Sequence, residues 1–180
     1  MLKGSCLCGA IQYELDAPLG QIGICHCQRC RKASGTAYGV NATVEEAGFR
    51  LVEGADSLTH FAGPTGVTRS FCRHCGSPLY SRRDSMRDAL RLRLGCLDTP
   101  IAERPLFHFF TGSKAEWDEI HDDLPQHPER PQDPQALAPG RRTTQSQAPR
   151  RQTSQAAKAP QRAARKTTRG NQKPATKPPR

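Results

Sequence analysis

Seven of the eight cysteines fall into three short clusters, and this spacing constrains the fold more than any other feature. The clusters are Cys6 and Cys8, then Cys25, Cys27 and Cys30, then Cys72 and Cys75. The outer two clusters together provide four thiolates, and the middle cluster provides three. Four protein ligands close a structural zinc site, whereas three leave an open coordination position for chemistry. The spacing predicts a two-zinc domain with one structural and one reactive metal.

A disulfide framework is the first alternative, because eight is an even number of cysteines. The segment 1–6 has no apolar signal-peptide core, so we expect the chain to stay in a reducing compartment. Cys-x-Cys places both thiols on one face of an extended segment, which suits two bonds to one metal ion. Ferredoxin spacings differ from these, which disfavours an iron–sulfur cluster. A zinc ribbon would need two Cys-x-x-Cys pairs about 15–20 residues apart. The four cysteines of the outer clusters span far more of the chain, so a whole β domain must bring them together.

Glycine directly follows both outer clusters, at Gly9 and Gly76. Glycine permits a sharp turn after which backbone amides can point at sulfur, as expected in a metal-binding knuckle. Arg29, Arg31 and Arg73 lie beside the clusters. They either balance the negative charge of a thiolate-bound metal or belong to the solvated surface.

Composition divides the chain near residue 125. Residues 1–124 carry 14 Lys and Arg against 15 Asp and Glu, whereas residues 125–180 carry 13 against 2. Beyond Pro125 the only large apolar residue is Leu137, so this segment cannot bury enough apolar surface to fold. We expect one folded domain over 1–127 and a disordered basic tail over 128–180. No apolar run approaches the roughly 18 residues of a membrane span.

Short extended segments separated by turn residues predict a mainly β domain. The clearest is 90–94, where leucine alternates with arginine, so that the leucines should face the core and the arginines the solvent. Further strands are expected at 10–15, 37–44, 49–52, 58–61, 67–71 and 106–110.

One short helix is expected near the end of the domain. Residues 113–116 fit a capping box, and Pro125 lies beyond the expected end. Trp117 and Ile120 would form its apolar face, with Trp117 as its anchor.

Three cysteine motifs together resemble the glutathione-dependent formaldehyde-activating family, which also includes centromere protein V. They are Gly-Ser-Cys-Leu-Cys-Gly at 4–9, Cys-His-Cys-Gln-Arg-Cys-Arg at 25–31 and Phe-Cys-Arg-His-Cys-Gly-Ser-Pro-Leu at 71–79. Gly-Cys-Leu-Asp at 95–98 and the segment from Ser113 to Pro125 resemble later landmarks of the same family. The resemblance covers about residues 1–127.

The resemblance implies a β-tent, in which small antiparallel sheets surround two zinc sites. It also implies a zinc-dependent carbon–sulfur lyase that forms or cleaves adducts of the S-hydroxymethylglutathione type from a glutathione-like thiol and an aldehyde. The natural thiol and aldehyde stay open. By motif, the structural zinc would be held by Cys6, Cys8, Cys72 and Cys75, and the catalytic zinc by Cys25, Cys27 and Cys30.

Other polar residues near these motifs are expected to have structural roles. A side chain between two knuckle cysteines usually points away from the metal, so neither His26 nor His74 is expected to be a ligand. Cys96 follows a leucine-rich strand and is expected in the core. No general base is assigned.

The basic tail supports an alternative function of another class. A disordered cationic segment can bind nucleic acid through phosphate contacts, and the absence of aromatic residues argues against base stacking. The alternative is therefore a non-catalytic zinc module that binds nucleic acid or chromatin with weak sequence selectivity and strong salt dependence. A tail that only aids solubility would bind none. We expect a cytoplasmic location, or a nuclear one in a eukaryotic cell.

Overall fold

The computed structural model describes residues 1–131. The tail expected at 128–180, and with it the proposed nucleic-acid binding, lies almost wholly outside the described residues. Within the described part, no helix has both the length and the apolar character needed to cross a membrane.

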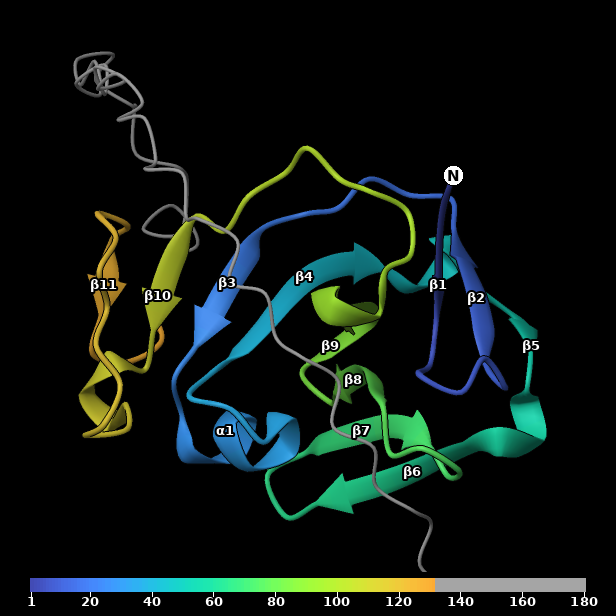
Figure 1. Ribbon diagram of the computed structural model, residues 1–180, viewed down its shortest axis with the longest axis horizontal. Helices are drawn as coiled ribbons and strands as arrows, with labels where there is room; N and C mark the ends of the chain where they lie inside the picture. Colours follow the sequence, from blue (N-terminus) through green and yellow to red (C-terminus); the bar gives the residue numbers. More distant parts are fainter. Residues whose placement is uncertain (132–180) are drawn as a thin grey trace, which may run out of the picture. The chain divides into compact units, whose positions relative to one another are not determined.

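Strands dominate the structure, which confirms the mainly β prediction (Figure 1). Three strands form one sheet in the order β1-β2-β5, and eight form another in the order β11-β10-β3-β4-β9-β8-β7-β6. The strands are β1 Leu2–Ser5, β2 Gln12–Leu15, β3 Ile22–Cys25, β4 Gly39–Glu45, β5 Phe49–Glu53, β6 Leu58–Gly63, β7 Val67–Cys72, β8 Pro78–Arg83, β9 Met86–Arg93, β10 Phe107–Phe109 and β11 Gln126–His127. Short 3-10 turns lie at Glu46–Gly48, Ala55–Ser57, Leu94–Cys96 and Thr111–Ser113.

The pairing is antiparallel except at one end of the larger sheet. There β10 runs parallel to both β3 and β11, so the antiparallel pairing that the resemblance implies does not extend to this end. A long connection after Cys96 returns the chain to the outer edge of β3, as Figure 1 shows, and this crossover allows parallel pairing.

The main core lies under β2, β8 and β9. Tyr13, Leu79, Leu90 and Leu92 are all almost fully buried. The leucines of the alternating segment therefore face inward, as predicted. Arg93 is only 7 % exposed, so the expectation that every arginine of this segment faces solvent is wrong.

The helix expected after Ser113 is absent from the structure. A 3-10 turn at Thr111–Ser113 is followed by irregular backbone, and Trp117 is 73 % exposed instead of anchoring a helix. The Lys114 ammonium donates to the carbonyl oxygens of Ala115 and Asp118, and Ala115 is the buried residue of this segment. Hydrogen bonds from the Lys114 side chain to nearby backbone carbonyls replace those of the predicted helix. The helix predicted from the capping-box pattern is therefore wrong.

The single α-helix among the described residues is α1, Gln28–Ser34, which the sequence analysis did not predict. It contains no buried residue, so it has no apolar stripe from which a helix could be predicted. Cys27 is its N-cap, and Gly35 ends it in the left-handed conformation at φ 66°.

Gly54 offers a test of this backbone. Its φ is +82°, and an added Cβ would lie 2.0 Å from the carbonyl oxygen of Ala10. We expect Gly54→Ala to lower the free energy of unfolding by about 2 kcal/mol or more, because both the left-handed backbone and the fixed carbonyl oppose a side chain.

Urea denaturation would measure this loss against Gly95→Ala, whose Cβ would meet no atom within 4 Å. The control should change stability by less than about 0.5 kcal/mol. Equal stability of the two variants would contradict the assignment of strain to Gly54.

Candidate metal centres

The four-cysteine centre joins two turns from distant parts of the chain. The Sγ atoms of its members lie within 4.8 Å of one another. Cys8 Sγ is 3.5 Å from Cys6 Sγ and 3.8 Å from Cys72 Sγ. Cys6 and Cys72 are buried, whereas Cys8 is exposed. The fourth member is Cys75.

Both turns contain a glycine in the left-handed conformation, which confirms the expected role of these glycines. Gly9 and Gly76 have φ of 74° and 73°. Gly9 N–H donates to the Cys6 carbonyl, three positions earlier, and Gly76 N–H to the Cys72 carbonyl, four positions earlier, both at 2.9 Å. Leu7 N–H donates to Ser77 Oγ at 3.0 Å and so links one turn to the other. The two knuckles thus form one unit.

Polar contacts favour the thiolate form of Cys6 and Cys75 at this centre. Ile11 N–H donates to Cys6 Sγ at 3.3 Å. Hydrogen bonds from the side chain and backbone of Ser77 lower the pKa of Cys75 to about 5. All eight cysteines are free. Four converging sulfurs are the soft donor set of a closed tetrahedral site, so these residues fit a structural metal ion such as zinc.

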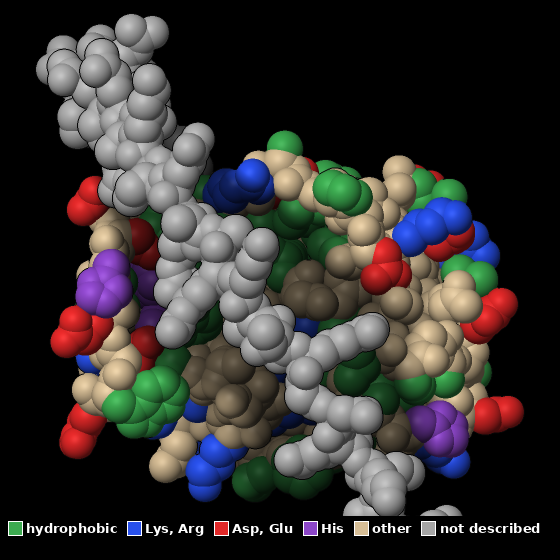
Figure 2. All heavy atoms as spheres, in the orientation of Figure 1, with side chains coloured by type: hydrophobic (Ala, Val, Ile, Leu, Met, Phe, Trp, Pro, Cys, Tyr) green, Lys and Arg blue, Asp and Glu red, His purple; other side chains and the backbone are tan. Residues whose placement is uncertain are grey.

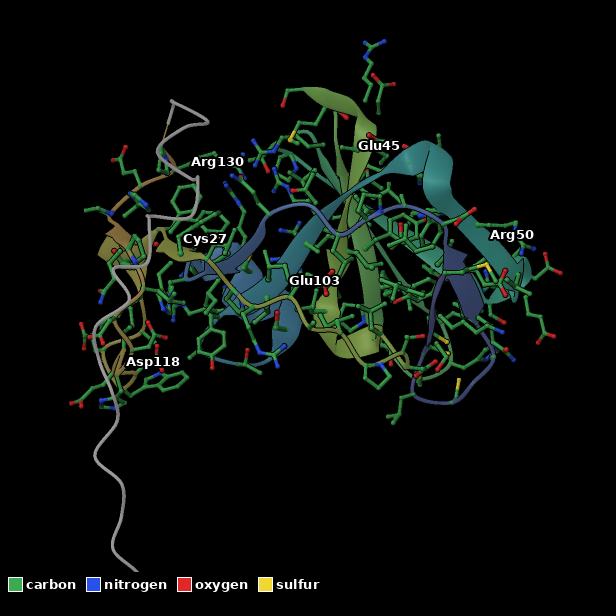
Figure 3. The ribbon with its side chains drawn as sticks, turned by 90° about the horizontal axis from the view of Figure 1, so that it is seen from above. Cys27, Glu45, Arg50, Glu103, Asp118 and Arg130 are labelled. Atoms are coloured by element: carbon green, nitrogen blue, oxygen red, sulfur yellow. The ribbon has the colours of Figure 1, made fainter. Side chains whose placement is uncertain are left out.

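The three-cysteine centre lies where β3 leads into α1 (Figure 3). Cys25 ends the strand, Cys27 caps the helix and Cys30 lies in the first turn, with all three Sγ atoms within 4.8 Å of one another. Cys25 Sγ is 3.5 Å from Cys27 Sγ, and Cys30 N–H donates to Cys27 Sγ at 3.4 Å. The helix therefore fixes two of the three sulfurs relative to the strand.

Crowding separates the acidities of these thiols. The hydrogen bond from Cys25, followed by that from Cys30, lowers the pKa of Cys27 to about 2. The hydrogen bond between Cys25 and Cys27, followed by that between Cys25 and Cys30, raises the pKa of Cys25. Three sulfurs so close together need a cation to be ionised at once, and the donor set fits a metal ion with one coordination position left for another ligand.

Arg93 supplies positive charge beside this centre. A Cβ added at Gly39 would lie 2.4 Å from Arg93 Nη1 and 3.5 Å from Cys30 Cβ, so the buried guanidinium occupies the space that glycine leaves. Nη1 is also 3.5 Å from Ser34 Oγ on α1. The sequence analysis missed Arg93 because it assigned the residue to the solvent face.

His26 lies between two of the cysteines but points away from their sulfurs. Its ring is fully buried, and its Nε2 is 2.8 Å from His108 Nδ1. His108 Nε2 is 3.0 Å from Asp122 Oδ1, and His26 Nδ1 is 3.6 Å from Asp118 Oδ2. Acidic and histidine side chains gather over β10 and β11 (Figure 2).

Hydrogen-bond roles follow from Asp122, which can only accept. His108 Nε2–H therefore donates to Asp122, His108 Nδ1 accepts, and His26 Nε2–H is the donor between the rings. Burial, followed by the neighbouring His108, lowers the pKa of His26, while Asp118 opposes this shift. The network fixes the short segment between Cys25 and Cys27.

Other residues singled out in the sequence lie outside both centres. His74 is exposed, as expected for a side chain between two knuckle cysteines. Cys96 is half-buried against the core, with Sγ 3.2 Å from the Pro78 carbonyl oxygen. Arg31 donates to the Ser113 carbonyl, while Arg29 is exposed. His108 and Asp122 gave no sequence signal, because only the crossover to β10 brings them near His26.

Comparisons with known proteins identify two that are similar to this chain. A curated protein of Halomonas elongata, named as a proposed glutathione-dependent formaldehyde-activating enzyme, is 29 % identical over 128 residues. That alignment covers 67 % of this chain and 81 % of the relative. A crystal structure of a Rhodobacter sphaeroides protein is similar over 56 % of this chain and 91 % of its own, with 28 % identity and a TM-score of 0.48.

The family comparison covers both centres. The sequence model described as glutathione-dependent formaldehyde-activating enzyme matches residues 1–113, which include all seven clustered cysteines. This match spans well over half of the chain, so the chain belongs to the glutathione-dependent formaldehyde-activating enzyme family.

Proposed function

We propose that residues 1–127 form a two-zinc enzyme domain. The converging sulfurs support this proposal, since one group fills a tetrahedral site and the other leaves it one ligand short. The structural zinc is held by Cys6, Cys8, Cys72 and Cys75, and the catalytic zinc by Cys25, Cys27 and Cys30.

The proposed reaction forms or cleaves a carbon–sulfur bond in a thiol–aldehyde adduct of the S-hydroxymethylglutathione type. In the forming direction the thiol sulfur bonds to the aldehyde carbon, and the thiol proton ends on the former carbonyl oxygen. In the reverse direction this hydroxyl loses its proton, the carbonyl re-forms and the thiol leaves. Zinc bound by these three thiolates would supply Lewis-acid chemistry to the aldehyde oxygen. The incomplete sulfur set, in a chain of this family, is the observation that carries the proposal.

The chain's own residues hold this site in a fixed geometry. The N-cap position of Cys27 sets the direction of its sulfur, and the guanidinium of Arg93 offsets negative charge beside Cys30. On the opposite side, His108 anchors His26 and therefore the segment between the first two ligands. His108 is a positioning residue in this scheme, because it acts through His26.

Zinc content tests the assignment of the two centres. We expect two zinc ions per chain in the reduced protein, and one after Cys27→Ser with the fold retained, because the four-cysteine centre is separate. Elemental analysis with circular dichroism would measure both. Cys96→Ser is the matched control, since Cys96 belongs to neither centre, and it should keep two. One zinc in the native protein, unchanged by Cys27→Ser, would exclude the middle cluster as a metal site.

Turnover is tested by the rate of exchange between glutathione plus formaldehyde and their adduct at equilibrium. Exchange spectroscopy by NMR should show acceleration by the zinc-loaded protein, and Cys27→Ser should return it to the uncatalysed rate. Because the adduct forms spontaneously, the comparison needs equal concentrations with and without protein. A native protein that holds two zinc ions and gives no acceleration would contradict the proposed reaction.

The positioning role of His108 can be separated from general stability. We expect His108→Phe to lower the free energy of unfolding by about 1–3 kcal/mol, because His26 loses its buried hydrogen-bond partner. The variant should also lose zinc from the three-cysteine centre more readily to a chelator. His108→Gln, which can accept from His26 and donate to Asp122, should restore zinc retention. Equal chelator sensitivity in His108→Phe and the native protein would exclude the positioning role.

A further inference from the structure

A cavity of about 630 Å³ opens on the larger sheet, within the size range of small-molecule sites. Strands β3, β4, β9 and β10 contribute to its walls, and the segment after β11 contributes Arg130. Its principal lining residues are Gly23, Asn41, Thr43, Arg91, Phe107 and Arg130.

The strand register places this cavity next to the three-cysteine centre. Gly23 precedes Cys25 by two positions on β3, so both share one face of the strand, about 7 Å apart. Asn41 pairs with Gly23, and Thr43 pairs with Arg91, which continues the same face across β4 to β9. Burial, followed by repulsion from Arg83, lowers the pKa of Arg130, and the thiols of Cys25 and Cys30 oppose this shift. Figure 3 shows Arg130 near the segment that carries Cys27.

Aromatic rings form the apolar wall of the cavity. A Cβ added at Gly23 would lie 2.7 Å from the Phe107 ring, so glycine lets the ring approach the strand closely. Phe107 and Phe109 have ring centroids 5.8 Å apart. The guanidinium of Arg130 lies 5.5 Å from the Phe109 ring centroid, which orients it without a carboxylate.

No carboxylate among the described residues forms an ion pair with the arginines at this cavity. Arg83, Arg91 and Arg130 form no ion pair there, and the Nε atoms of Arg83 and Arg130 are buried without a hydrogen-bond partner. Burial, followed by repulsion from Arg130 and Arg83, lowers the pKa of Arg91 to about 10. By contrast, neighbouring Arg82 is paired with Glu46 at 2.5 Å. Such a cluster favours a bound anion, which would offset the repulsion.

We propose that this cavity binds a carboxylate of the thiol substrate, with Arg91 and Arg130 as its cationic partners. The aromatic wall then packs against the ligand's aliphatic part, and the thiol reaches toward Cys25. The arginines recognise a carboxylate whatever the reaction, while the choice of a glutathione-like ligand rests on the proposed function. Thiols that lack a carboxylate lose this interaction.

A second cavity of about 450 Å³ is less suited to this role. Arg29 and Lys32 at its rim are exposed, so water already solvates their charges and an anion gains little from them. Its buried arginine, Arg93, already lies beside Cys30 and Ser34, where it offsets the charge of the three-cysteine centre. The partly buried arginines of the first cavity interact more strongly with an anion, because less water screens them.

The test measures binding of S-methylglutathione to the zinc-loaded full chain by isothermal titration calorimetry. This probe keeps both carboxylates but has no free thiol, so its binding requires no turnover. We expect Arg91→Met and Arg130→Met each to weaken binding at least about tenfold. Arg87→Met is the matched control, because Arg87 lies on the same strand outside the cavity and is exposed, and its affinity should equal the native value.

The diethyl ester of S-methylglutathione provides a test on the native protein that does not depend on variant folding. It should bind at least about tenfold more weakly than the acid, and Arg91→Met should not weaken it further. Equal binding of ester and acid, equal binding by Arg91→Met and native protein, or no binding of the acid at millimolar concentration would each overturn the proposal. Arginine-dependent binding without exchange of the formaldehyde adduct would refute the proposed reaction and leave the carboxylate site standing.

Discussion

The convergence of sulfur atoms from distant segments is the constraint on which the rest of the domain depends. Cys8 and Cys72 lie 64 residues apart in the chain, yet their Sγ atoms are 3.8 Å apart. The hydrogen bond from Leu7 to Ser77 holds the same two turns together. Ionised thiols at these distances repel one another, so a bound cation would convert its binding free energy into folding free energy. The small sheet and the β7–β8 hairpin are thereby fixed relative to each other.

Strand β3 separates two environments of the three-cysteine centre. Side chains alternate between the faces of a strand, so Gly23 and Cys25 share the face of the arginine-lined cavity. His108 pairs in register with Ile24, and its ring belongs to the buried histidine network. One face of the strand thus provides rigidity through hydrogen-bonded histidines, whereas the other provides arginines that form no ion pair with a carboxylate among the described residues. The side chains that position the cysteines are therefore different from those proposed to bind the substrate.

Short-range patterns in the sequence predicted what depends on a few neighbouring residues. Cysteine spacing predicted both sulfur groups, and alternation predicted the burial of Leu90 and Leu92. Helix α1 was missed because it buries nothing, while the helix at Trp117 was wrong because Lys114 bonds to nearby carbonyls instead. The histidine network and the arginine cavity depend on the crossover to β10 and on cross-strand register, which no local pattern encodes.

The clustered cysteines, which short-range patterns predicted, lie before residue 113, and several residues that depend on long-range pairing lie after it. All seven clustered cysteines lie within the residues that the family model matches, 1–113. Asp118, Asp122 and Arg130 come from the segment after this match, yet the first two face the histidines and the third faces the arginine cavity. Donor atoms must satisfy strict metal geometry, whereas an anchoring acid or a substrate-binding arginine can come from any segment that returns to the site. On the proposed function, changes in residues 114–131 would therefore alter ligand preference while the sulfur sites stay the same.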